Sequence, residues 1–446
     1  MTNTIYKFIG VGIGPFNLGL AALSAPLDCK ALFFDKAPEF NWHPGLMLDD
    51  ATLQVPFMAD LVTMADPASP YSFLNFMKET NRIYKFYIRE NFFILRREYN
   101  EYCRWASRKL ENCLFGQEVL NVEFEDGLYK LNIRNCNTGE SATYYAEKLV
   151  LGTGTQPYIP EDIRQKQFER VYHTSSYLYQ KEEILKQPSV TIVGSGQSAA
   201  EILQDLLPHT RNGLHLNWIT RSVRFFPLEN HSRLTLELTS PEYVDYFHSL
   251  PDSKRLDLLK SQSNLYKGIN YDLINQIYNS LYAMEVADGK VNVSLVANSE
   301  LKDISSADDL YSLEFLQVEQ QKSFSIDTSC VIMATGYKYR EPEFLKNIEQ
   351  RINRRNDGLM NVARNYTIDM GESEIYVQNA ELHTHGLSTP DLGMGAYRNA
   401  FILNEILERE VYKVEDKIAF QTFDVGQITN QLAEKGKQLQ PELISL

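Results

Sequence analysis

Short apolar runs that lead into glycine-rich turns recur along this chain. Residues 5–11 (IYKFIGV) and 189–193 (SVTIV) are rich in β-branched and aromatic side chains, and a helix-like stretch follows the turn after each run. Two more apolar runs open the segments 149–160 and 330–340 and also lead into glycine. Strands that alternate with helices form parallel sheets. The pattern therefore predicts an α/β fold with two Rossmann-like domains.

The first turn, GIGPFN, has the spacing G-x-G-x-x-N, with Asn17 in the place of a third glycine. Gly12 permits a tight turn, and Gly14 lets the backbone approach a pyrophosphate at the N-terminus of the next helix, where free N–H groups favour anions. Asp35 ends the following strand, 23 residues after Gly12. A carboxylate at this place accepts a hydrogen bond from a ribose hydroxyl. These positions predict a dinucleotide site.

The second turn repeats the spacing as Gly194-x-Gly196-x-x-Ala199. The strand that follows it leads into Arg221, where the first unit has an acid. A guanidinium can bind a ribose phosphate through two hydrogen bonds. This half of the chain is therefore predicted to prefer NADPH to NADH.

Two nucleotide-binding folds in one chain usually divide the work between a bound flavin and a nicotinamide. The apolar runs at 149–160 and 330–340 mark the places where the chain would cross between the two folds. We expect a split flavin domain, formed by residues 1–160 and 331–446, around a nicotinamide domain of residues 161–330. A small, mainly helical substrate region is predicted within this insert, at about residues 228–287.

Composition narrows the class of protein. The chain has 446 residues, is 43% hydrophobic and carries a formal net charge of −14, which argues against a nucleic-acid partner or an anionic membrane surface. Its five cysteines form no CxxC pair, so neither a metal site nor a disulfide framework is predicted. No uninterrupted run of 18 apolar residues and no signal-peptide pattern occur. We expect a cytoplasmic protein without a membrane span that binds small molecules.

Eight motifs in order resemble the flavin-dependent N-hydroxylating monooxygenases of siderophore biosynthesis, the lysine and ornithine N-hydroxylase family, and most closely its members that act on lysine, ornithine and diamines. The motifs are GIGPFN (12–17), NWHPG (41–45), LQVPFMADLV (53–62), SPYSFLNF (69–76), GTGTQP (152–157), GSGQSAAE (194–201), ATGY (334–337) and THGLSTPDLG (384–393).

The resemblance implies a reaction and its cofactors. NADPH would reduce FAD, O2 would add to give a C4a-hydroperoxyflavin, and a neutral amine would attack the distal oxygen to form a hydroxylamine. Such a site must mainly position the reactants and exclude water, and it needs no protein nucleophile. The resemblance also implies a homo-oligomer, with a tetramer expected.

The resemblance assigns roles to matching positions. Those expected to bind cofactors are Gly12, Gly14, Pro15, Asn17, Asp35, Trp42, His43 and Gln54 for FAD, Gly194, Gly196, Gln197, Ser198 and Arg221 for NADPH, and Thr335, Gly336 and Leu387 at the domain crossing and the C-terminal motif. Those expected to border the substrate are Ala59, Leu236, Asn270 and Ser388. Gln54 and Asn270 are the expected catalytic residues, although helix capping would also explain Asn270. His383 and His385 are expected to order a loop and not to bind metal.

The strip QVPFMADL (54–61) carries the main substrate clue. Lysine and ornithine enzymes have in this register a lysine that holds the substrate carboxylate, whereas this chain has Ala59. An unpaired, desolvated carboxylate is costly, so a substrate without one is favoured. We expect a small diamine, putrescine or cadaverine. Histamine, an amino-acid substrate, another two-nucleotide flavin oxidoreductase such as a disulfide reductase, and a non-catalytic flavin protein stay open.

Overall fold

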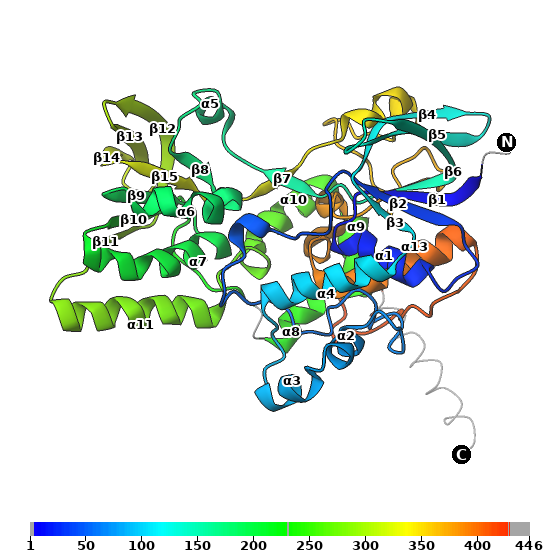
Figure 1. Cartoon of the computed structure of the whole chain (residues 1–446), viewed down its shortest axis with the longest axis horizontal. Helices are drawn as coiled ribbons and strands as arrows, with labels where there is room; N and C mark the ends of the chain where they lie inside the picture. The colour runs from blue at the N-terminus through cyan, green and yellow to red at the C-terminus, as the bar shows by residue number, and fades with distance from the viewer. Residues whose placement is uncertain (1–3, 230–231, 427, 429–446) are drawn as a thin grey trace, which may run out of the picture.

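The computed structural model describes residues 4–229, 232–426 and 428 and shows two lobes that lie side by side (Figure 1). Each lobe is built on a mainly parallel sheet with helices against it, which confirms the α/β class with two Rossmann-like domains. None of the helices in the described part of the chain combines the length and apolar character that a bilayer-spanning helix requires.

The first lobe contains a seven-stranded sheet in the order β3-β2-β1-β6-β5-β4, with β17 beside the end of β6. Its central strands are parallel, and β4 and β5 add an antiparallel hairpin. The strands are β1 (Ile5–Val11), β2 (Ala31–Asp35), β3 (Cys113–Phe115), β4 (Gln117–Glu125), β5 (Leu128–Asn135), β6 (Ser141–Leu151) and β17 (Ile375–Val377).

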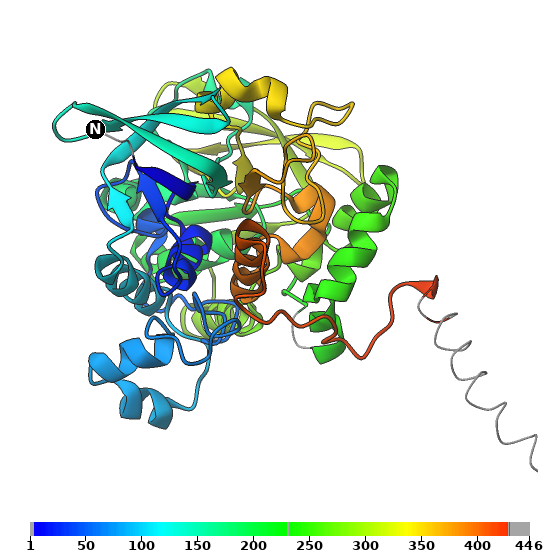
Figure 2. The same ribbon diagram turned by 90° about the vertical axis from the view of Figure 1, so that its right-hand side faces the viewer.

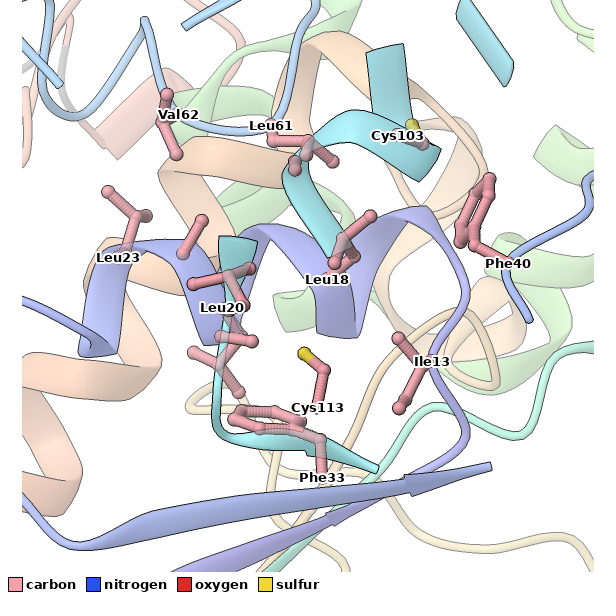
Figure 3. Packing of buried hydrophobic residues seen from close by; sticks show 14 of the residues in the cluster. Ile13, Leu18, Leu20, Leu23, Phe33, Phe40, Leu61, Val62, Cys103 and Cys113 are labelled. Atoms are coloured by element: carbon pink, nitrogen blue, oxygen red, sulfur yellow. The ribbon is translucent and has the colours of Figure 1, made fainter. Parts of the chain in front are cut away.

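Successive residues of the central strands pack into different cores because strand side chains alternate between faces. Phe8 and Phe33 face the core shown in Figure 3, whereas Ile9 and Phe34 face the core on the other side of the sheet. The helices on the Figure 3 side are α1 (Pro15–Ser24), α2 (Phe73–Glu79), α3 (Ile83–Arg89), α4 (Arg96–Lys109) and α13 (Gly395–Leu407), and η6 (Glu343–Arg351) covers the other face. Burial on both faces explains why these strands are nearly all apolar.

The second lobe has a five-stranded parallel sheet in the order β11-β10-β9-β15-β8. Helices α6, α7 and α11 pack on one face, and an antiparallel sheet of β12, β13 and β14 covers the other. The elements are β8 (Val171–His173), β9 (Ser189–Val193), β10 (His215–Ile219), β11 (Val293–Val296), β12 (Ser299–Ala307), β13 (Leu310–Gln317), β14 (Lys322–Thr328), β15 (Cys330–Met333), α5 (Glu161–Arg164), α6 (Tyr177–Leu185), α7 (Gln197–Leu206) and α11 (Tyr271–Asp288).

The region expected to be helical, residues 228–287, is mainly helical over its described residues, 228–229 and 232–287, but it divides between the lobes. Helices α9 (Pro241–Ser249) and α10 (Asp252–Ser261) contact α12 (Leu382–His385) of the first lobe, whereas α11 packs on α7. In Figure 2 the segment after α13 runs out toward the green helices of this region. The remaining helical turns are α8 (Arg233–Leu236), η1 (Pro44–Leu46), η2 (Thr174–Ser176), η3 (Leu207–Asn212), η4 (Glu237–Thr239), η5 (Ser263–Leu265), η7 (Gly386–Ser388) and η8 (Leu392–Met394).

The chain crosses between the lobes at a two-stranded ribbon, in which β7 (Thr155–Pro157) pairs with β16 (Tyr337–Tyr339). The chain returns to the first lobe a few residues after the expected boundary at residue 331. Strand β15 pairs with β9 and β8, so residues 331–333 belong to the second sheet and the return follows Met333. An apolar strand sequence predicts burial but does not say which of two sheets the strand joins.

A second contact joins the lobes at η1. Leu46 belongs to the first lobe in sequence, but its side chain is buried in the core of the second lobe with Tyr177 and Ile184. Gly45 allows this approach, because a Cβ there would lie 1.8 Å from the carbonyl oxygen of Ser175.

We expect Leu46→Ala to lower the free energy of unfolding by about 2–5 kcal/mol, because it leaves a cavity in a packed core. Urea unfolding followed by fluorescence measures this change. The control is Leu359→Ala, whose side chain is 47% exposed and should change stability by less than about 0.5 kcal/mol. Equal effects of the two substitutions would contradict the placement of Leu46 in the second core.

Candidate functional site

The first glycine turn is held tightly against the end of β6. Gly12 has a φ of +88°, and a Cβ there would lie 2.4 Å from the carbonyl oxygen of Gly152. Only glycine suits a position that combines positive φ with such a close backbone contact. The turn therefore aims the N-terminus of α1 past the end of the sheet.

Gly14 lies on the open side of the same turn. It precedes the first turn of α1, which begins at Pro15, and a Cβ at Gly14 would meet no heavy atom within 4 Å. Asp35 fixes the turn from the next strand, because its Oδ2 accepts from Ile13 N at 2.7 Å and its Oδ1 accepts from Ala37 N at 2.8 Å. Each carboxylate oxygen keeps a further lone pair for a ribose hydroxyl. The open helix N-terminus and the adjacent acid fit the pyrophosphate and ribose of a dinucleotide.

Asn17 has a different place from the one expected of a cofactor ligand. Its side chain is buried, its Nδ2 donates to Gly12 O at 2.8 Å, and its Oδ1 accepts from Gln378 Nε2 at 2.7 Å. Both ends of the amide are thus bonded inside the protein. Asn17 supports the turn from within, where a third glycine would leave space.

The second glycine turn repeats the geometry of the first. Gly194 has a φ of +137°, and a Cβ there would lie 2.2 Å from the carbonyl oxygen of Ala334, at the end of β15. Gly196 precedes α7 and is open, since the nearest atom to a Cβ would be Lys267 O at 3.8 Å. Ser198 is partly exposed in the first turn of α7. The second lobe therefore presents another open helix N-terminus.

Two cations lie next to this second turn. Arg221 is exposed just after β10, and its charge, together with desolvation as the larger cause, lowers the pKa of Lys267. Sequence reasoning found Arg221 from its place in the fingerprint and missed Lys267. The sequence does show that Lys267 is a basic residue just before α11. That it lies close to Arg221, however, depends on how α11 packs on α7 in the folded protein.

Trp42 and His43 lie at the junction between the lobes. The Trp42 ring packs against Tyr99 at a centroid distance of 5.3 Å, and the His43 ring contacts Tyr337 at 5.6 Å. His43 has a φ of 50°, and its ring reaches solvent. Desolvation by the protein around the ring, and the nearby Arg96 guanidinium, lower the pKa of His43 to about 4. The imidazole is therefore neutral at physiological pH.

Three predicted residues meet although they come from separate segments. Gln197 Oε1 accepts a hydrogen bond from Asn270 N at 2.7 Å and a longer one from Gln54 Nε2 at 3.4 Å. The Asn270 side chain caps α11, because its Oδ1 accepts from Asp272 N and Leu273 N. The capping alternative is therefore what the structure shows for the Asn270 side chain.

The strip around Ala59 is shaped by Asp60. This buried carboxylate accepts hydrogen bonds from the backbone N–H groups of Val62, Thr63 and Phe73 at 2.7–3.0 Å. Burial raises the pKa of Asp60, and these hydrogen bonds oppose that shift. Ala59 is itself buried, with 6% of its surface exposed. Asp60 therefore builds the loop that fixes the position of Ala59.

The expected residues of the ATGY and THGLSTPDLG motifs are bonded or packed within the protein. Thr335 Oγ1 donates to Tyr158 O, and Gly336 O accepts from Tyr158 N at 2.9 Å, so both residues hold the lobe crossing. Leu387 is buried against Tyr243 and Phe247, and Ser388 Oγ donates to His385 O at 3.0 Å. Leu387 and Ser388 thus lie inside a packed turn.

The two C-terminal histidines order loops, as the sequence predicted. His383 Nε2 donates to Met360 O at 2.8 Å, and His385 Nε2 donates to Arg364 O at 3.2 Å.

The acids near the expected substrate residue Leu236 hold the C-terminal segment. Leu236 is 49% exposed on α8. The adjacent Glu237 accepts hydrogen bonds from the N–H groups of Phe420 and Gln421, and the first of these is the main reason that its pKa is lowered. Glu242 similarly accepts from Ile418 N and Ala419 N. These contacts hold residues 418–421 against η4 and α9.

Two lobes that each present an open helix N-terminus define the class of two-nucleotide oxidoreductases. The chain belongs to the L-lysine 6-monooxygenase/L-ornithine 5-monooxygenase family, which matches residues 4–339. This membership confirms the resemblance drawn from the eight motifs and identifies the chain as a flavin-dependent monooxygenase.

Three similar proteins show which members of the family this chain resembles. It is 49% identical to a putrescine N-hydroxylase of Shewanella oneidensis, over 94% of this chain and 84% of that protein. It is 52% identical to the FAD-bound cadaverine monooxygenase of the desferrioxamine pathway of Erwinia amylovora, with a TM-score of 0.92 over 95% of this chain and 99% of that one. An ornithine N-hydroxylase of Kutzneria, solved with reduced FAD, NADP+ and L-ornithine, is 26% identical, with a TM-score of 0.83 over 91% and 99%.

We expect the His43 imidazole to stay neutral until the pH falls to about 4. Because the unfolded chain would bind this proton near pH 6.5, His43 makes the protein less stable as the pH falls from about 6.5 to about 4. Nitrogen NMR of the imidazoles, with His43→Gln for assignment, measures the titration. Arg96→Gln should raise the pKa of His43, since it removes a neighbouring positive charge. Titration of His43 near 6.5 in the unsubstituted protein would contradict the assignment.

Proposed function

We propose that this protein catalyses the NADPH- and O2-dependent N-hydroxylation of a small primary diamine, putrescine or cadaverine, for hydroxamate siderophore biosynthesis. The observation that carries the substrate choice is the buried Ala59, which stands where a carboxylate-binding lysine is expected. The similarity to a putrescine N-hydroxylase and to a cadaverine monooxygenase supports the same choice.

The energetic argument concerns the carboxylate end of the substrate. An amino acid brings a carboxylate that loses water on binding, and burial of a charge without a partner costs several kcal/mol or more. The nearby Asp60 gives no help, because it is an acid whose oxygens are already used by backbone N–H groups. A decarboxylated amine avoids this cost.

The residues of the first lobe fit FAD. Gly14 and Asp35 would hold its pyrophosphate and ribose, while Trp42, His43 and Gln54 would lie along the flavin. Bound FAD supplies the activation of O2 and the transfer of one oxygen atom to nitrogen. The neutral His43 adds no positive charge beside the incoming amine.

The second lobe fits NADPH. Gly194, Gly196, Gln197 and Ser198 would border the pyrophosphate, and Arg221 with Lys267 would pair with the ribose phosphate. The amine must be neutral to react, and its free pKa lies near that of lysine, about 10.4. A poorly hydrated site would lower the pKa of the amine and would keep bulk water away from the reaction.

A disulfide reductase is the less favoured alternative because its chemistry requires reactive thiols. Burial raises the pKa of Cys113 and of Cys330 to about 12, and Cys103 is also fully buried with a raised pKa. Reactive thiols have lowered pKa values and are accessible. N-hydroxylation of histamine, lysine or ornithine stays an alternative within the family. We also expect a cytoplasmic homo-oligomer, with a tetramer as the family expectation.

Gly14→Ala and Gly12→Ala separate FAD binding from folding. Gly14→Ala should leave the stability of the ligand-free protein unchanged, because its Cβ meets no protein atom, but weaken FAD binding roughly tenfold or more by occupying the pyrophosphate approach. Gly12→Ala should destabilise the ligand-free protein by roughly 1–3 kcal/mol through backbone strain. Thermal unfolding and FAD titration measure the two effects. Normal FAD affinity in Gly14→Ala would exclude this turn as the flavin site.

NADPH-dependent turnover with putrescine, cadaverine, histamine, lysine and ornithine tests the substrate. We expect hydroxylamine formation with the diamines and little with the amino acids. Ala59→Lys should lower kcat/KM for diamines roughly tenfold, because it adds a like charge near a cationic substrate. It should also raise turnover of lysine or ornithine. Detection of the hydroxylamine, together with NADPH oxidation, distinguishes hydroxylation from wasted reduction of O2.

The matched control is Met58→Lys, which places the same side chain on the neighbouring residue. Met58 is 47% exposed, so its substitution should leave the substrate preference unchanged. Robust hydroxylation of lysine or ornithine alone by the unsubstituted protein would overturn the diamine assignment.

A further inference from the structure

Glu201 is a buried carboxylate for which the reaction itself gives no role. It lies on α7 with 5% of its surface exposed. Its Oε1 accepts from Arg96 Nη2 at 2.6 Å and from Gln197 Nε2 at 2.8 Å, and its Oε2 accepts from Arg96 Nη1 at 3.0 Å. Arg96 belongs to α4 of the first lobe. The Glu201 carboxylate therefore forms a bidentate ion pair with Arg96 of the other lobe and also accepts a hydrogen bond from the side chain of Gln197.

The bond from Gln197 to Glu201 decides which way the Gln197 amide points. An ionised carboxylate only accepts hydrogen bonds, so the NH2 end of the amide must face Glu201. The oxygen end then faces the Asn270 N–H and the Gln54 NH2 group, which are both donors. A reversed amide would set oxygen against carboxylate and NH2 against two donors, so that none of these hydrogen bonds could form.

The Gln197 amide bonds to the Glu201 carboxylate on α7, to the backbone N–H of Asn270 and to the side chain of Gln54, which come from three separate segments of the chain. Gln54 belongs to the strip that contains Ala59, and its Nε2 also donates to Gly268 O at 3.4 Å. Asn270 begins α11, and Gly268 follows Lys267. The orientation of one amide therefore sets the distance between the strip and the segment that leads into α11.

We propose that Glu201 is a positioning residue for the reaction. It fixes the Gln197 amide so that Gln197 holds the Asn270 backbone and Gln54 in register across the two lobes. Arg96 holds the Glu201 carboxylate in place through two hydrogen bonds, and Arg96 Nη1 also donates to Leu46 O at 2.9 Å. These hydrogen bonds join protein groups only and do not depend on a ligand, whereas their link to catalysis rests on the proposed function.

Different results are expected if Glu201 has only a structural role. If Glu201 served only to tie the lobes together, breaking its pair with Arg96 would loosen the whole junction, and Gln197 would contribute independently. If Glu201 acts through Gln197, the two residues form one unit, and their effects on Asn270 do not add.

Hydrogen–deuterium exchange of the ligand-free protein at the amide of Asn270 tests the proposal. Glu201→Gln should speed this exchange by about tenfold, the factor expected when one buried hydrogen bond is removed. Gln197→Leu should do the same with the Arg96–Glu201 pair intact. The double variant should exchange no faster than Gln197→Leu alone. Glu183→Gln, which neutralises an exposed acid paired with Lys186 on α6, is the control and should change nothing.

In the enzyme supplied with FAD, NADPH and putrescine, Glu201→Gln should lower the ratio of hydroxylated product to NADPH consumed, while Glu183→Gln should leave it unchanged. Unchanged exchange at Asn270 in Glu201→Gln, or additive effects in the double variant, would overturn the proposal. If Glu201→Gln does not fold, Gln197→Leu decides, since normal exchange at Asn270 in that variant also overturns it. Exchange is measured without an amine, so its outcome is independent of whether putrescine is the substrate.

Discussion

A buried ion pair sets the relation between the two halves of this protein. Arg96 of the first lobe meets Glu201 of the second through two hydrogen bonds, and both side chains are almost fully buried. Removal of one partner of such a pair typically costs about 3–5 kcal/mol, because the other charge stays buried and unpaired. The pair therefore ties α4 of the first lobe to α7 of the second at a defined geometry. Leu46 and Gln197, which each bond to one of the partners, take their places from it.

The two nucleotide-binding folds share the same arrangement of glycines in the turn after the first strand of each fold. In each turn the first glycine lies against a strand-end carbonyl, and the second lies open at a helix N-terminus. The turns thus offer similar anion sites and cannot by themselves distinguish two cofactors. We propose that the distinction comes from the charge that follows the next strand, since Asp35 could accept a hydrogen bond from a free ribose hydroxyl and Arg221, with Lys267 beside it, could pair with a ribose phosphate.

We propose that substrate selection follows from a missing positive charge. The strip around Ala59 offers no cation, and its acid, Asp60, is engaged in building the loop. The acids beside Leu236 and at the start of α9, Glu237 and Glu242, accept hydrogen bonds from the backbone of residues 418–421. The electrostatic case for a diamine therefore depends on the cost of burying an amino-acid carboxylate near Ala59 without a cation to pair with it.

The sequence by itself determined the elements and the two turns. Apolar runs predicted β1, β2 and β9, glycine spacing predicted the turns that follow β1 and β9, and Asn270 was placed correctly just ahead of α11. These features are local, since φ, strand alternation and helix capping depend on residues near in sequence. Only the tertiary structure decided that β15 joins the second sheet, that Asn17 and Leu387 are buried, that Lys267 stands beside Arg221, and that Glu201 orients Gln197. Those facts arise from contacts between residues far apart in the chain, and no periodicity or spacing records which distant side chains will meet when two lobes pack together.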